Sequence, residues 1–128
     1  MPMTFVLDHE NRLVRSKGWG VVSAADMSDV KGRLLATQFD PTYREFCDFS
    51  GVTDFQLTGK EVQTFATTSP FSKTARRAVI VSSDVVYGMV RMYGLMGDRD
   101  SNYHRVFRDA ASALRWLGVS EDAPSAEN

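Results

Sequence analysis

The sequence predicts one α/β domain: a mixed β-sheet of about five strands with helices packed against it, in the order β-β-α-β-α-β-α-β-α. Two closely spaced alternating segments near the N-terminus indicate a β-hairpin, and from Ser23 onward helical apolar stripes alternate with short apolar strands. The 128 residues, 43% of them hydrophobic, suit one core without crosslinks. We expect the domain to span residues 1–119 and the small, acidic segment 120–128 to be a disordered tail.

The hairpin is predicted from two segments in which side chains alternate, at residues 4–8 and 12–19. The polar residues 9–11 between them suit a tight turn. Ser23 then begins a helix, because Ser23 and Asp26 have the spacing of a capping box and apolar residues follow at helical intervals. Asp40-Pro41 ends this unit, since the residue before proline avoids the helical conformation.

The middle of the chain predicts an interior strand at residues 44–49, a loop at 50–55 and a helix that begins at Thr58. Thr58 and Glu61 form a second capping box, and Ser69-Pro70 ends the helix. Residues 78–81 are apolar and mostly β-branched, which predicts a strand buried on both faces.

The last third of the chain predicts two more helices around one more strand. The residues 82–84 cap a helix over residues 85–96, and residues 103–107 form the last strand. Asp109 caps the final helix, and Gly118 ends it. Short connections between strand, helix and strand favour parallel pairing, so the hairpin adds an antiparallel strand to a parallel sheet.

Composition limits the classes of function. With 15 basic and 16 acidic residues, the net charge of −1 gives no general attraction to nucleic acid. No apolar run approaches the roughly 20 residues that span a bilayer, and the N-terminus lacks the pattern of a signal peptide. One cysteine, Cys47, excludes an internal disulfide. We therefore expect a cytoplasmic protein without a membrane span.

Catalytic and metal-binding patterns are not apparent in the sequence. His9 and His104 have no neighbouring His, Cys or acid at ligand spacing, so we expect neither a metal nor a cofactor. No nucleophile and base can be assembled from them either, so we expect a protein that is not an enzyme. Lys73, Arg76 and Arg77 form a basic cluster that suits a phosphate or an acidic partner.

Residues 48–59, Asp-Phe-Ser-Gly-Val-Thr-Asp-Phe-Gln-Leu-Thr-Gly, resemble the central motif of STAS domains. Residues 77–81, 86–93, 106–109 and 113–117 are similar to the SpoIIAA-like branch of that family, which consists largely of uncharacterised bacterial proteins. The resemblance implies a SpoIIAA-like fold and a role in protein interaction or regulation. It also implies a phosphorylated Ser or Thr at the helix start, which corresponds to Thr58 or less directly to Ser50, with Leu57 where the family has Asp.

Thr58 has two interpretations. A helix N-terminus favours an anion, so Thr58 is the candidate phosphosite, with Gly59 and Lys60 as the candidate anion contacts. Alternatively, Thr58 is only the N-cap, a role worth about 1 kcal/mol that Glu61 completes.

The helix predicted over residues 85–96 carries more apolar side chains than one face needs. Its surplus stripe is a candidate homodimer interface or the wall of an apolar pocket, and the residues concerned are Val85, Met89, Met92, Tyr93 and Met96, with Phe65 and Phe71 as further pocket candidates. The other explanation is that a neighbouring helix covers this side.

Two hypotheses of function follow. The first is a non-enzymatic interaction module that forms a homodimer and contacts a protein partner. The second is a carrier or sensor of a lipid or small apolar ligand, held in a pocket beside the helix at residues 85–96.

Overall fold

The computed structural model describes residues 2–97 and 102–119. The tail predicted at residues 120–128 lies outside this range. Within it, the elements follow the predicted order: β1 (Met3–Asp8), β2 (Leu13–Ser23), α1 (Ala24–Leu35), β3 (Arg44–Gln56), α2 (Gly59–Thr67), β4 (Arg77–Ile80), α3 (Asp84–Met96), β5 (His104–Phe107) and α4 (Ala110–Leu117). The prediction of a mixed five-stranded α/β fold is confirmed.

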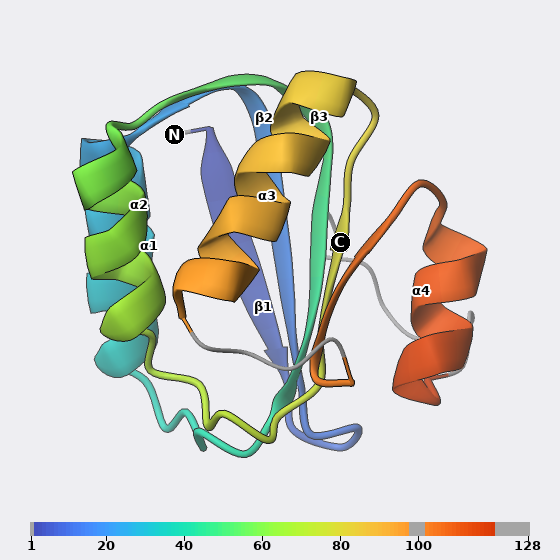
Figure 1. Ribbon diagram of the computed structural model, residues 1–128. Coiled ribbons are helices and arrows are strands. Elements are labelled where there is room, and N and C mark those ends of the chain that lie inside the picture. The colour runs from blue at the N-terminus through green and yellow to red at the C-terminus, as the bar shows by residue number, and fades with distance from the viewer. Residues whose placement is uncertain (1, 98–101, 120–128) are drawn as a thin grey trace.

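The sheet has the strand order β1-β2-β3-β4-β5, so each strand lies beside its neighbours in sequence. The β1–β2 pair is antiparallel, and the other three pairs are parallel. The helices α1, α2 and α3 cover one face of this sheet, and α4 covers the other (Figure 1). The core is accordingly divided between the two faces.

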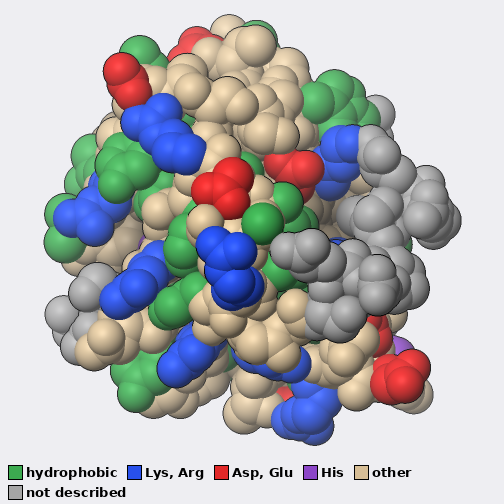
Figure 2. Space-filling model, turned by 90° about the vertical axis from the view of Figure 1, so that its right-hand side faces the viewer, with side chains coloured by type: hydrophobic (Ala, Val, Ile, Leu, Met, Phe, Trp, Pro, Cys, Tyr) green, Lys and Arg blue, Asp and Glu red, His purple; other side chains and the backbone are tan. Residues whose placement is uncertain are grey.

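Alternation along the strands decides which core each side chain enters. On the face under α3, Cys47 and Val79 pack with Val86 and Val90. On the opposite face, Ala78 and Ile80 pack with Leu114 and Leu117 of α4. Figure 2 shows the side of the molecule on which α4 lies, where Lys and Arg are spread among apolar and uncharged side chains.

The predicted loop at residues 50–55 is instead the second half of β3. Residues 51–56 pair with Trp19 to Ser23, so both strands run further than the local sequence suggested. Two register shifts interrupt this pairing, and Gly20 lies between them at a positive φ of 64°. The Ser-Gly-Val-Thr-Asp sequence is typical of a loop, but β2 supplies the hydrogen bonds that extend it as a strand.

The helix starts agree with the predicted caps. Ser23 and Thr58 both form complete capping boxes, and Ser83 and Asp109 accept from backbone N–H groups of α3 and α4. Gly118 ends α4 in the left-handed conformation with φ of 74°. These short-range signals locate the helices without reference to the tertiary structure.

One glycine sets how closely α3 approaches the sheet. A Cβ added at Gly94 would lie 2.8 Å from Nδ1 of His104, which is buried on β5. Gly88, on the same helix, has nothing within 4 Å of the corresponding position. Gly94 therefore allows the helix backbone to lie against the imidazole.

We expect Gly94→Ala to destabilise the protein by about 1–3 kcal/mol, because the new methyl group must displace the His104 ring or the helix. Gly88→Ala is the matched control, and its better helix propensity should raise stability by up to about 1 kcal/mol. Urea unfolding of both variants checks this. Equal effects of the two substitutions would contradict the close packing of Gly94 on His104.

Candidate functional site: a cavity with a buried polar row

A cavity of about 120 Å³ lies between the sheet and the three helices α1, α2 and α3. Strands β1 to β5 form its floor, and the segment after α2 closes one side. Within the described part of the chain, most of the lining side chains are apolar. They come from elements far apart in sequence, so the cavity exists only in the folded domain.

Sulfur and aromatic side chains dominate the apolar end of the cavity. Met3, Met27 and Met89 line it from β1, α1 and α3. Phe49 and Phe55 of β3 meet edge to face, with ring centroids 5.4 Å apart, and also line it. Methionine side chains are flexible and polarizable, so this lining can adapt to ligands of different shapes.

A row of three polar side chains crosses the floor. The register pairs Glu45 of β3 with Arg77 of β4, and Arg77 with His104 of β5. All three line the cavity, and their exposed fractions are 7%, 8% and 6%. We refer to Glu45, Arg77 and His104 as the polar row.

Glu45 and Arg77 form a buried ion pair. Nε and Nη2 of Arg77 each lie 2.9 Å from Oε1 of Glu45. The second carboxylate oxygen, Oε2, accepts from the Ser16 hydroxyl at 3.1 Å. Each carboxylate oxygen of Glu45 therefore has a hydrogen-bond donor, the Arg77 guanidinium for Oε1 and the Ser16 hydroxyl for Oε2.

The remaining side of the guanidinium faces α3 and the segment after α2. Nη1 of Arg77 donates to the Tyr93 hydroxyl at 2.9 Å and to the Ser69 hydroxyl at 3.2 Å. The Phe71 ring stacks under the guanidinium, 4.4 Å from its carbon to the ring centroid. Arg77 therefore ties β4 to β3, to α3 and to the segment that closes the cavity.

Burial and charge act in opposite directions on Arg77. Burial disfavours its charged form, but Glu45 and the Tyr93 hydroxyl outweigh this, so the pKa of Arg77 is raised and the guanidinium stays protonated. Burial also raises the pKa of Cys47, which lines the cavity two residues after Glu45. Cys47 is consequently a thiol of low reactivity.

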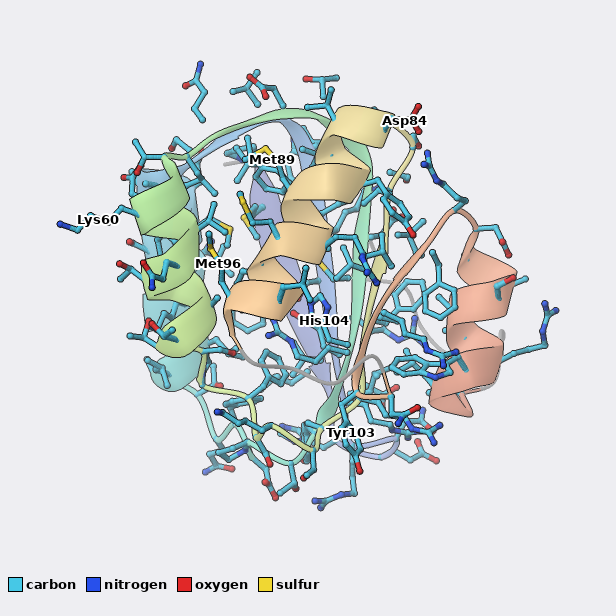
Figure 3. All side chains as sticks on the ribbon, viewed as in Figure 1. Lys60, Asp84, Met89, Met96, Tyr103 and His104 are labelled. Carbon is cyan, nitrogen blue, oxygen red and sulfur yellow. The ribbon has the colours of Figure 1, made fainter. Side chains whose placement is uncertain are left out.

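Some of the apolar residues predicted to form a stripe on α3 line the cavity, and the others do not. Met89 and Tyr93 line the cavity, as do Phe65 and Phe71, whereas Met92, Met96 and Val85 are not in its lining. Figure 3 shows Met89 and Met96 on the side of α3 that faces α2. Val85 and Leu95 are 64% and 70% exposed, so α3 also presents apolar side chains to solvent.

Thr58 lies at the exposed start of α2, away from the cavity lining. Its hydroxyl accepts from the backbone N–H of Glu61 at 3.1 Å, and Glu61 accepts in turn from the Thr58 N–H at 2.9 Å. Lys60 points away from the body of the molecule (Figure 3). Gly59 is exposed and has open space where a Cβ would be.

Sequence reasoning missed the polar row. The sequence places Arg77 in a basic cluster with Lys73 and Arg76, and Glu45 is one charge among the residues of an interior strand. The available signal was alternation: Arg77 shares a strand face with Val79, and Glu45 with Cys47. Only the β3–β4 register, which the sequence does not display, brings the two charges together.

No helix among the described residues has the length and apolar character needed to cross a membrane. Over the same residues, no three His, Cys, Asp or Glu side chains are grouped so that they could hold a metal ion.

Comparison with protein-family models and with characterised proteins finds no match. Among solved structures, the chain is similar to an uncharacterised protein of the DUF3478 family with a SpoIIAA-like fold from Shewanella loihica PV-4. The TM-score is 0.62, with 16% identity over 90% of this chain and 93% of that one. The likeness shows the fold alone: the chain has a SpoIIAA-like fold, as its resemblance to STAS domains implied.

We expect Glu45→Gln to lower the free energy of unfolding by about 3–5 kcal/mol at neutral pH, because it leaves the buried Arg77 charge uncompensated. Asp29→Asn makes the same chemical change in the exposed Asp29–Arg33 pair of α1 and should cost at most about 1 kcal/mol. Guanidinium chloride unfolding compares the two. A loss at Glu45 as small as that at Asp29 would contradict the buried pair.

Proposed function

We propose that this chain is a non-enzymatic binding module that carries or senses a small, largely apolar ligand in the cavity under α3. The observation that supports this is the cavity itself, with its apolar lining and its single polar end. Small-molecule sites are commonly concave and mostly apolar, with a few placed polar groups. A cytoplasmic location suits the module, since its one cysteine is buried as a thiol.

The size of the cavity limits the ligand. A dry cavity of about 150 Å³ lined by apolar side chains binds benzene. At about 120 Å³, this cavity suits a ligand about the size of one aromatic ring, with any longer part extending toward solvent. A whole phospholipid would not fit inside without rearrangement of the helices.

A second candidate function rests on the exposed side of α3. Val85 and Leu95 are largely exposed there, and Gly88 between them leaves space for another helix to approach. Contiguous apolar patches on a protein surface mark protein–protein contacts. We propose that this side of α3 forms a homodimer contact or receives a protein partner, the role implied by the resemblance to STAS domains.

Toluene is the probe for the cavity. We expect it to raise the melting temperature in proportion to the logarithm of its concentration, as linkage requires, and to give a saturable calorimetric titration. Val30→Phe should weaken toluene binding about tenfold or more, because Val30 of α1 lines the cavity and the added ring fills part of it.

Val85→Phe is the matched control, because it is the same substitution in a helix but lies outside the cavity lining. It should leave the toluene affinity unchanged. No saturable toluene binding by the original chain, or equal loss in both variants, would contradict a ligand-binding cavity.

Light scattering coupled to size exclusion tests the α3 contact. We expect a dimer at high micromolar concentration, and we expect Leu95→Lys to convert it to a monomer by placing a charge in the contact. Leu35→Lys, the same change at an exposed position of α1, should leave the dimer intact. A monomeric original chain would contradict the homodimer contact and leave only a different protein as the partner of this side of α3.

A further inference from the structure

The polar end of the cavity defines the chemistry of the ligand more narrowly than its volume does. The proposed function requires only that something small and apolar binds. The contacts around Arg77 add a second requirement, because they determine whether a charged ligand group can bind at the polar end of the cavity. A preference for one ligand charge rests on the proposed function, because it requires that the cavity bind a ligand, and it can be tested separately from that binding.

The two buried charges at this end cancel. Glu45 and Arg77 are in contact at 2.9 Å, and both are more than nine-tenths buried. A carboxylate on the ligand would have to displace Glu45 from Arg77 or lie against it as a like charge. An ammonium group would meet Arg77 in the same way. Either ion would lose its hydration without gaining an uncompensated partner.

Among the described residues, the cavity lining also includes the ammonium group of Lys31 on α1. Its ammonium group donates to the Thr68 hydroxyl at 2.7 Å in a solvent-exposed hydrogen bond. Water and salt screen a charge in that position, so its attraction for an anion is weak. Lys31 therefore does not make the polar end of the cavity, where Glu45 and Arg77 compensate each other, attractive to an anion.

Uncharged hydrogen-bonding groups find partners at this end without disturbing the ion pair. Tyr93 lines the cavity, and its hydroxyl oxygen accepts from Arg77 at 2.9 Å. A hydroxyl both donates and accepts, so the Tyr93 O–H can donate to a ligand oxygen. Ser16 also lines the cavity; its hydroxyl donates to Glu45 at 3.1 Å, which leaves its oxygen lone pairs to accept.

We infer that the ligand is a neutral amphipathic molecule whose polar group is an alcohol or an amide, with an oxygen that accepts from Tyr93 and an O–H or N–H that donates to Ser16. Its apolar part lies toward Met27, Met89 and Phe55. Carboxylates and amines of the same shape are excluded by the buried Glu45–Arg77 pair. The pair thus serves as a filter on ligand charge as well as a structural link.

Three probes of the same shape test the inference: benzamide, benzoate and benzamidinium, which are neutral, anionic and cationic at pH 7. Toluene, which has no polar group, measures binding by the apolar part of the cavity without the polar end. We expect calorimetry to show benzamide binding at least about tenfold more tightly than either ion. Binding of benzoate or benzamidinium as tight as benzamide would overturn the inference.

Tyr93→Phe should lower benzamide affinity about three- to tenfold, the effect of one hydrogen bond, with toluene affinity unchanged. Tyr87→Phe is the control, because Tyr87 packs under Arg108 with a 4.7 Å cation–ring distance and is not in the cavity lining. If Tyr93→Phe is unfolded by circular dichroism, Ser16→Ala replaces it with the same expected loss.

The outcomes for the two proposals are distinguishable. Toluene binding with benzamide bound tenfold more weakly than toluene would overturn the neutral polar ligand while leaving the cavity function in place. Equal benzamide affinities in the Tyr93→Phe and Tyr87→Phe variants would do the same. Absence of binding by all four probes, toluene included, would overturn the proposed function and this inference together.

Discussion

The buried Glu45–Arg77 pair constrains more of this structure than any other interaction. It joins β3 to β4, and through the Tyr93 and Ser69 hydroxyls it also joins the sheet to α3 and to the segment after α2. Such a pair contributes little net stability compared with a well-packed apolar pair, because both ions lose their hydration. The pair instead fixes the register of β4 against β3. If β4 slipped by one residue, the Arg77 side chain would point into the apolar core under α4, and the Glu45 charge would have no partner.

The pair also explains why a cavity persists in a domain of this size. Apolar side chains over a sheet would normally collapse into contact. Here the Arg77 guanidinium holds the Tyr93 hydroxyl of α3 by a hydrogen bond, and the Phe71 ring packs against the guanidinium. The distance of α3 from the sheet at this point is therefore set by a hydrogen bond as well as by apolar packing. Gly94 then lets α3 approach the sheet at His104, beyond the pair. Helix α3 therefore lies close to the sheet at Gly94, whereas the neighbouring Tyr93 is hydrogen-bonded to Arg77 at the cavity.

Most of the fold could be predicted from the sequence because its signals are local. Ser23, Thr58, Ser83 and Asp109 act as caps within one helical turn, and β4 is marked by the β-branched residues Val79 and Ile80. The second half of β3 could not be predicted in this way. Its Ser-Gly-Val-Thr-Asp sequence has no local preference for a strand, and only pairing with Trp19 to Ser23 of β2 makes it one.

The candidate site was predictable only on its apolar side. The helical spacing of Met89 and Tyr93, with Phe65 and Phe71, indicated side chains available to a pocket. The polar side depends on two residues 32 positions apart whose charges meet across parallel strands. In the sequence Arg77 stands next to Arg76 and close to Lys73, which indicates a basic cluster before the buried strand and not a partner for Glu45. The better criterion is complementarity of charge. Glu45 and Arg77 lie near the starts of two adjacent parallel strands, carry opposite charges and share the face of Cys47 and Val79, so each can compensate the other when both are buried.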